Sequence, residues 1–342
     1  MPSPFLDSGG GRPPPRGTFT QGRPRVKPHR RAAYSTPVLR IREIDEDELP
    51  ELVAVAQAAQ PREEATVPGF VDWRRQAAQM VWMLAERDLE TVGGGFALTG
   101  WHTPPYRAIG AALVPPQHRG AGVGIRVLDA LEGWAAEHGA TELDGPVQED
   151  DDRSLAWAQG RGYSEVGRNS RLVLDLTAIE APEPAPPPGV EIVTWADRPE
   201  LAPGLYEVAR EAVPDIPGEE HDDPGTLEEW LARDMHGDSD DPRAVFVALL
   251  DGEVAGYAKL SLSPERTDRA YHDLTGVRRA YRGRGIAAAL KRTQIAWAKD
   301  NGYTSLQTSN EVRNEPIRRL NERYGYVVEP GVVIVRGVIS AT

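Results

Sequence analysis

Two stretches of the chain place glycine and arginine at the start of a predicted helix. They read "AYRGRGIAAALKRT" at residues 280–293 and "QHRGAGVGIRVLDA" at residues 117–130. The first backbone N–H groups of a helix have no partner within the helix, and the helix dipole adds partial positive charge there. Glycines remove the Cβ atoms that would keep an anion at a distance. Such a loop is suited to binding a diphosphate.

Two familiar phosphate-binding motifs do not fit these loops. A P-loop requires Gly-Lys-Ser/Thr, which the sequence lacks. A dinucleotide-binding fold requires G-x-G-x-x-G early in a βαβ unit. Here "GRGIAA" lacks the third glycine and follows several strands of antiparallel type, which disfavours a dinucleotide.

The second loop is embedded in a predicted series of strands and helices. "RAVFVALLDGEVAGYAKLSL" predicts two strands joined at Asp251-Gly252, and "DRAYHDLTGV" predicts a third. A helix over 285–300 follows, ended by Asn301-Gly302. "YTSLQTS" predicts a strand, "NEPIRRLNERY" a helix, and "GYVVEPGVVIVRGVI" a closing strand pair. The mixture predicts an α+β fold, with helices packed on a mixed and mostly antiparallel sheet.

The same order of elements occurs earlier in the chain. When the sequence is shifted by 163 positions, Arg119 falls on Arg282, Trp134 on Trp297 and Gly139 on Gly302. One offset holds without a gap from about residue 88 to residue 163. We therefore predict a duplicated domain.

Composition divides the chain into four parts. Residues 1–36 are rich in Gly, Pro and Arg, which predicts a disordered tail. "EAPEPAPPPG" predicts a stiff, extended linker at 179–189, because proline at this density cannot join a helix or the interior of a sheet. The predicted domains are therefore 37–178 and 190–342.

Overall composition excludes several classes of function. The net charge of −13 disfavours nucleic acid as a partner. The lack of cysteine excludes disulfides, thiolate metal sites and an acyl-cysteine intermediate, and we expect no metal. No apolar run approaches the roughly 18 residues of a membrane span, and no secretory signal is recognisable, so we expect a cytoplasmic protein.

The two loops share the form Arg-x-x-Gly-x-Gly/Ala, as "RGAGVG" at 119–124 and "RGRGIA" at 282–287. Each follows a strand that ends in valine, Val114 or Val277. They resemble the pyrophosphate loop of the GNAT superfamily of acyl-CoA-dependent N-acyltransferases. "NEVRNEPIRRLNERYGYVV" resembles the last conserved segment of one large subgroup of that family. The resemblance covers both predicted domains.

The resemblance implies that acetyl-CoA is the co-substrate, that its pantetheine arm lies where two strands splay apart, and that an amine attacks the thioester directly. It implies cofactor binding by both loops and by later asparagines: Val114, Arg119, Gly120, Ala121, Gly122, Val123 and Gly124, then Val277, Arg282, Gly283, Arg284, Gly285, Ile286, Ala287, Asn310, Asn314 and Asn321. The arginines would add mobile positive charge. For Asn314, helix capping is an equal alternative.

Catalytic candidates follow from the same resemblance. Asp273 is the first candidate for the base that takes the proton of the amine, and His272 is the second. Adjacent residues of a strand face opposite ways, so only one of them should point into the site. Asn321 stands where many relatives have a tyrosine that protonates the leaving thiolate. An amide cannot donate that proton, so Asn321 is expected to bind the cofactor or polarise its sulfur.

The two copies differ at these polar positions. The offset matches Asn310, Asn314, Asn321, His272 and Asp273 with Val147, Asp151, Ala158, Ile109 and Gly110. The loop is kept in the first copy, whereas most of the polar side chains are not. We therefore predict that 190–342 is the catalytic half, and that 37–178 is degenerate.

The predicted function is an N-acetyltransferase that acts on a primary amine of a small molecule. Acidic residues that include Glu219, Glu220, Asp222 and Asp223 would form a rim that attracts a cationic amine, or an ordinary solvated loop. Two alternatives stay open: a protein N-acetyltransferase, and a non-catalytic sensor that binds CoA. The oligomeric state is left open.

Overall fold

The computed structural model describes residues 38–63, 65–100, 103–216, 225–263 and 266–339. The predicted tail at 1–36 lies outside these ranges, as do Glu219, Glu220, Asp222 and Asp223 of the predicted acidic rim. Within the described ranges, none of the helices has the length and apolar character that a membrane crossing requires.

The two halves repeat one series of elements. The first half contains β1 (Leu39–Glu43), α1 (Leu49–Ala59), α2 (Val67–Gln76), β2 (Gln79–Arg87), β3 (Glu90–Thr99), β4 (Arg107–Leu113), α3 (Val123–Glu137), β5 (Glu142–Gln148), α4 (Asp152–Gly160) and β6 (Ser164–Asp175). The second half contains β7 (Val190–Thr194), α5 (Ala202–Ala212), α6 (Leu227–Asp234), β8 (Asp240–Leu250), β9 (Glu253–Leu262), β10 (Arg269–Val277), α7 (Ile286–Asp300), β11 (Ser305–Glu311), α8 (Glu315–Arg323) and β12 (Val327–Val338). The bounds of α3, β5, α4 and β6 map onto those of α7, β11, α8 and β12 at the predicted offset of 163. The predicted duplication and the mixed α/β fold are confirmed.

The described strands form one sheet in the order β1-β2-β3-β4-β5-β12-β6-β11-β10-β9-β8-β7. Neighbours are antiparallel except for two pairs, β4 with β5 and β10 with β11. Both parallel pairs are short. Arg107–Ile109 pairs with Glu142–Asp144, and Arg269–Tyr271 pairs with Ser305–Gln307. Beyond these residues the two strands of each pair are no longer hydrogen-bonded to one another.

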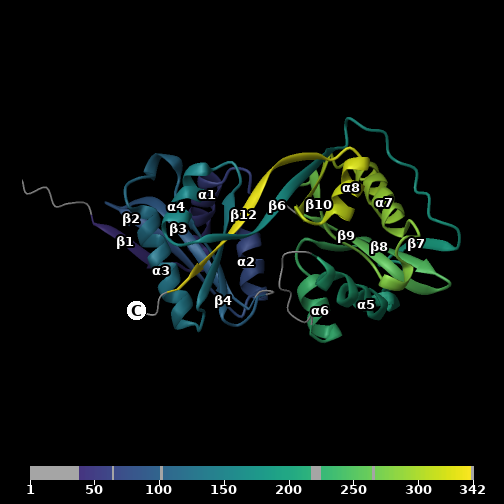
Figure 1. The fold of residues 1–342 in the computed structure, drawn as a ribbon, viewed down its shortest axis with the longest axis horizontal. Coiled ribbons are helices and arrows are strands. Elements are labelled where there is room, and N and C mark those ends of the chain that lie inside the picture. The colour runs from purple at the N-terminus through teal and green to yellow at the C-terminus, as the bar shows by residue number, and fades with distance from the viewer. Residues whose placement is uncertain (1–37, 64, 101–102, 217–224, 264–265, 340–342) are drawn as a thin grey trace, which may run out of the picture. The chain divides into compact units, whose positions relative to one another are not determined.

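The last strand of each half crosses into the sheet of the other half (Figure 1). Asn169–Asp175 of β6 pairs with β11, and Val332–Val338 of β12 pairs with β5. The two crossing strands also pair with one another. The halves therefore share strands at the middle of the sheet.

The crossing replaces the closing strand pair that we expected from "GYVVEPGVVIVRGVI". The structure has one strand, β12, whose register against β6 shifts between Glu329 and Val332. Gly331 lies at this shift, where a Cβ would stand 1.8 Å from the carbonyl oxygen of Asn169. Only glycine permits this approach of two backbones.

Helices cover both faces of the sheet in each half. In the first half, α3 packs on one face and α1 with α2 on the other. In the second half, α7 and α5 take the corresponding faces. The core under α3 includes Val333 and Val335 of β12, and the core under α7 includes Leu172 and Leu174 of β6. The exchanged strands are thus part of the core that they enter.

The proline-rich linker runs along α7. Lys299, near the end of α7, donates to the carbonyl oxygen of Leu176, and Arg292 donates to that of Ala185. Pro187 lies beside Gly285, at the start of the helix. The linker has no helix or strand from 180 to 189, as its composition predicts (Figure 1).

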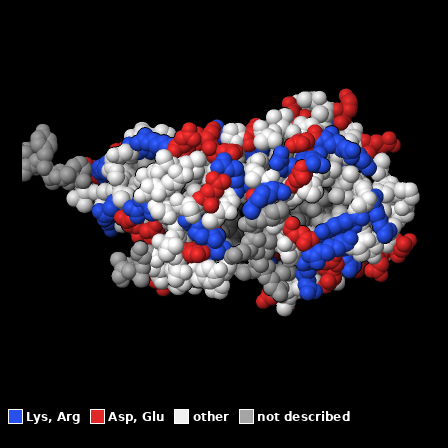
Figure 2. All heavy atoms as spheres, in the orientation of Figure 1, with Lys and Arg blue, Asp and Glu red and all other residues white. Residues whose placement is uncertain are grey.

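Surface charge is mixed in sign. On the face shown in Figure 2, acidic and basic side chains alternate and no large area of one sign appears. Many charged side chains of the described residues form ion pairs, such as Arg62 with Asp150 and Arg168 with Glu149.

Candidate functional site

The first glycine loop leads from β4 into α3 through a short 3-10 turn at Pro116–His118. Gly120 and Gly122 have φ of +82° and +80°, where any residue with a Cβ is strained. Gly122 is the N-cap residue of α3, and no side chain of the described residues caps this helix. The first amides of α3 therefore have no partner within the helix.

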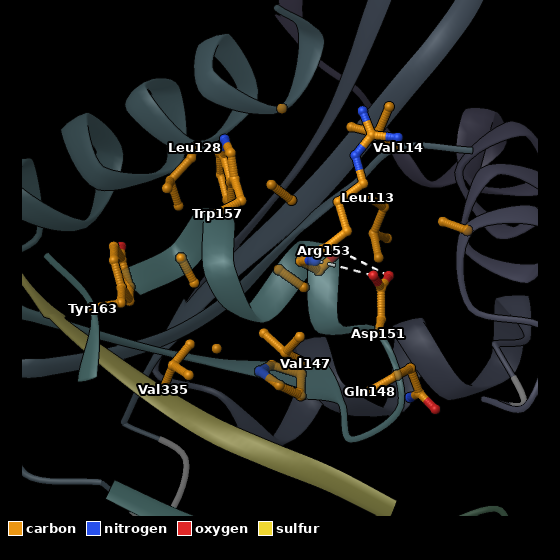
Figure 3. A pocket seen from close by; sticks show the side chains of 18 of the residues that line it. Leu113, Val114, Leu128, Val147, Gln148, Asp151, Arg153, Trp157, Tyr163 and Val335 are labelled. Atoms are coloured by element: carbon orange, nitrogen blue, oxygen red, sulfur yellow. Dashed lines mark hydrogen bonds between the residues drawn. The ribbon is translucent and has the colours of Figure 1, made fainter. Parts of the chain in front are cut away.

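A cleft of about 390 Å³ begins at this loop and lies between β4 and β5, where the two strands are no longer paired. Figure 3 shows Leu128, Trp157 and Tyr163 on one side of it, and Asp151 and Arg153 on the other. Val335 of the exchanged strand β12 also lines the cleft. The cleft is thus apolar at one end and polar at the other.

Arg119 braces the loop. Its Nε donates to the carbonyl oxygen of Val114 at 3.1 Å, and its Nη1 lies 2.9 Å from Oδ2 of Asp151. Burial alone would raise the pKa of Asp151, but hydrogen bonds from Ser154 and Arg119 outweigh it and lower that pKa. The guanidinium is therefore held by a carboxylate, in contrast to the mobile charge that we expected.

The second loop has the same backbone. Gly283 and Gly285 have φ of +75° and +82°, and Gly285 is the N-cap residue of α7. Arg282 donates to the carbonyl oxygen of Val277 and pairs with Asp215. Pro187 of the linker lies 3.6 Å from the position that a Cβ of Gly285 would take. The first loop has no such neighbour at Gly122, where a Cβ would meet no described atom within 4 Å.

Comparison with known proteins gives this arrangement a family. The profile of the acetyltransferase (GNAT) family matches residues 39–163 and again residues 203–326. The chain belongs to the GNAT family. It contains two GNAT halves in tandem, as the two loops predicted.

Solved GNAT structures resemble the whole described fold. A GCN5-related N-acetyltransferase from Sphaerobacter thermophilus is 21% identical with a TM-score of 0.68, and the match covers 89% of this chain and 96% of that one. A tandem GNAT protein from the clavulanic acid biosynthesis pathway is 19% identical with a TM-score of 0.72, covering 89% and 100%. A fungal region described as a glucosamine N-acetyltransferase is 16% identical with a TM-score of 0.68, covering 89% of this chain and 38% of that one. No curated protein matches the sequence.

In the second GNAT half, the predicted asparagines lie together. Asn321 is fully buried on α8 and donates to Oδ1 of Asn310 at 2.7 Å. Its own Oδ1 is buried, with no hydrogen-bond partner among the described residues. Asn314 occupies the N-cap position of α8, but its side chain makes no capping hydrogen bond within the part of the chain that is described. The matching Asp151 does cap α4, through the amide of Ser154.

His272 and Asp273 face opposite sides of β10, as alternation predicts. His272 is buried and contacts Gln294 and Tyr326 through its two ring nitrogens. Burial lowers its pKa well below the ordinary value, so the ring is neutral. The side chain of Asp273 is 45% exposed and lies 2.6 Å from Nζ of Lys259.

Lys259 ties Asp273 into a small network. Its ammonium also lies 2.9 Å from Asp240. Burial would lower the pKa of Lys259, but the two carboxylates outweigh it and raise that pKa. Among the described residues, no group of three or more His, Asp or Glu side chains is arranged to hold a metal ion.

Sequence reasoning missed three residues of these sites. Arg153 and Trp157 line the first cleft from α4. Lys291 of α7 is buried, with its Nζ over the ring of Tyr326. The offset of 163 contained a signal for Lys291, because its counterpart in the first half is the apolar Leu128.

Proposed function

We propose that this protein is an acetyl-CoA-dependent N-acetyltransferase that acylates a primary amine of a small molecule. The observation that carries the proposal is the cleft of about 390 Å³ that begins at the bare amides of α3. We also propose that this first-half cleft holds the acyl-CoA. Membership of the GNAT family supports an acyl-CoA as the donor.

The residues of the cleft fit the parts of coenzyme A. Amides at the start of α3 suit the diphosphate, because they combine free donors with the positive end of the helix dipole. Backbone groups of Gly110–Leu113 on the side of β5 are open beyond the last paired residue, Ile109. Pantetheine amides would pair with them as an added strand does.

The second half has less room for acyl-CoA beside its glycine loop. Pro187 stands beside Gly285, and Lys291 and Asn321 are almost entirely buried where the first half has Leu128 and Ala158. We infer that these longer side chains occupy the space that is open in the first half. A catalytic role for 190–342, with Asp273 as its base, remains the rival proposal.

Proton transfer distinguishes the two halves. An attacking amine must be neutral, so a base or a water molecule has to accept its proton. In the first half, Ile109 and Gly110 offer no titratable group. Tyr163 donates to Glu132 at 2.7 Å, and its pKa is raised by burial and by that carboxylate, so it stays protonated. Water is therefore the proposed proton acceptor in this half.

The same observation favours a second candidate, a protein that binds CoA without turnover. A mixture of the protein, acetyl-CoA and a panel of amines distinguishes the two by release of free CoA. The panel includes glucosamine, which one structural neighbour is described as acetylating, and a peptide with a free N-terminus. Binding without release across the panel would favour the second candidate.

Two matched variants locate the cofactor. Gly122→Val and Gly285→Val each place a branched side chain at a φ near +80° and at the mouth of one loop. We expect Gly122→Val to weaken acetyl-CoA binding at least tenfold in calorimetry, and Gly285→Val to leave it near the wild-type value. The reverse result would assign acyl-CoA to the second half.

A further inference from the structure

The first loop is surrounded by three arginines, of which two are already engaged. Arg87 donates to the carbonyl oxygen of Ala121 at 3.0 Å. Arg119 is held by Val114 and Asp151. The charge of Arg119 is thus paired with a carboxylate, whereas Arg87 keeps its charge and is hydrogen-bonded to the backbone of the loop.

Arg153 is the third. It projects from the first turn of α4, and its Nη2 lies 3.2 Å from the position that a Cβ of Gly120 would take. Its side chain lines the cleft and is exposed (Figure 3). Within the described residues it has no hydrogen bond and no ion pair. A free guanidinium thus faces the loop across the mouth of the cleft.

The second half provides an internal comparison. The offset of 163 places Pro316 where the first half has Arg153, and Arg284 where the first half has Ala121. Arg284 also has no carboxylate partner among the described residues, and its guanidinium lies over the ring of Tyr281. Among the described residues, each loop therefore has one arginine, Arg153 or Arg284, with neither a hydrogen bond nor an ion pair. In the second half that arginine comes from the loop, and in the first half it comes from α4.

Trp157 shows which face of α4 is turned to the start of α3. It lies four residues after Arg153, so the two side chains share one face of the helix. A Cβ on Gly124 would stand 3.7 Å from the indole of Trp157. The face of α4 that carries Arg153 beside Gly120 therefore also places Trp157 beside the first turn of α3.

We propose that Arg153 binds the diphosphate of acyl-CoA, which it holds against the amides of α3. This inference rests on the proposed function of the first-half cleft. A guanidinium presents two parallel N–H donors to a phosphate, and charge-assisted bonds of this kind are stronger than neutral ones. Because Asp151 pairs with Arg119, the loop Arg119–Gly124 has no unpaired cation of its own, and Arg153 would supply one.

The test compares three ligands that differ in their phosphates. Acetyl-CoA carries the diphosphate and a 3′-phosphate, acetyl-dephospho-CoA carries the diphosphate alone, and acetyl-pantetheine carries neither. Arg153→Met should raise the Kd of the first two by about 10- to 100-fold and leave the third unchanged. Arg153→Lys should recover part of the affinity, because lysine keeps the charge without the paired donors. Arg126→Met, on an exposed position of α3 outside the cleft lining, is the matched control and should change nothing.

Each other outcome has a defined meaning. Equal losses for all three ligands would show that Arg153 acts on the fold of the cleft, and unchanged binding of acetyl-CoA would show that it does not touch the ligand. A loss confined to acetyl-CoA would place Arg153 on the 3′-phosphate. All three results overturn the proposal and leave the first-half cleft as the cofactor site. Wild-type protein that binds none of the ligands would overturn the proposed function together with the clamp.

Discussion

Replacement of Lys291 by leucine, the residue at the matching position of the first half, should stabilise the protein near neutral pH. Lys291 is 1% exposed, its Nζ lies 5.5 Å from the centre of the Tyr326 ring, and it forms no ion pair with a carboxylate of the described residues. Burial lowers the pKa of Lys291 from 10.5 to about 7. A buried amine without a carboxylate partner is costly to charge.

The size of the effect follows from the two pKa values. A decrease of roughly 3.5 units corresponds to roughly 5 kcal/mol, at about 1.4 kcal/mol per unit. Below pH 7 the amine of Lys291 is protonated in both the folded and the unfolded chain, and the full free-energy cost of burying its charge lowers the stability of the folded protein. Between pH 7 and 10.5 the unfolded chain binds more protons than the folded chain, so the free energy of unfolding rises with pH. Above this window both forms are neutral and the penalty is absent.

Urea unfolding of the wild type and Lys291→Leu from pH 6 to pH 9.5 measures this difference. The variant should be more stable by several kcal/mol at pH 6, and its advantage should shrink by about 1.4 kcal/mol per pH unit above pH 7. Neighbouring groups do not obscure the window, because burial lowers the pKa of His272 and raises that of Tyr326. A difference that is independent of pH, or a less stable variant, would refute the reasoning.

Three further predictions concern the exchanged strand and the two sites. Gly331→Ala should lower the free energy of unfolding by about 1–3 kcal/mol, because its Cβ would overlap the carbonyl oxygen of Asn169; Gly133→Ala in the interior of α3 is the control and should stabilise by about 0.5–1 kcal/mol. Equal thermal denaturation of these two variants would contradict the crossing. Leu128→Lys should weaken acetyl-CoA binding in calorimetry by introducing a polar amine at the apolar end of the cleft, and unchanged affinity would argue against that position. Asp273→Asn should lower turnover about 100-fold at neutral pH with little change in CoA affinity if the second half is catalytic, and unchanged turnover removes Asp273 from the mechanism.

Local signals in the sequence predicted the elements well. The glycines that begin and end α3 and α7, and the Asp251-Gly252 turn between β8 and β9, act over a few residues and do not depend on the rest of the chain. The offset of 163 extended these signals to whole elements. Because the repeat carries the same turns at the same spacing, one half confirmed the other.

The crossing of β6 and β12 between the halves could not be predicted from these local signals. The sequence of β12 alternates in the same way whether it pairs with β5 or with β11, so its pattern does not choose between them. The stretch "GYVVEPGVVIVRGVI" was predicted to form a closing pair of strands. The structure uses Gly331 for contact with Asn169, a residue of the other half. A contact between residues so far apart in the sequence cannot be predicted from the pattern of neighbouring residues.

The first loop was predicted to bind the cofactor, but the open cleft beside it was not predicted. Sequence reasoning weighed the titratable side chains, which are concentrated in the second half. A cavity depends instead on the volume that side chains leave empty. Lys291 and Asn321 are long and buried, whereas Leu128 and Ala158 leave room between β4 and β5. Asn321, which was predicted to contact the cofactor, is thus one of two buried polar side chains that stand where the first half has the apolar Leu128 and Ala158.

The exchange of strands makes the first cleft a product of both ends of the chain. Val335 of β12 lines the cleft, and Arg336 forms two hydrogen bonds, of 2.6 and 2.7 Å, with Asp144 of β5. Asp144 belongs to the short segment where β4 and β5 are still paired, directly before they separate. Hydrogen bonds from β12 thus hold β5 at the residue where it separates from β4 and the cleft begins. The first half contributes the loop and most of the lining, and β12 of the second half contributes Val335 and the bonds of Arg336 to Asp144.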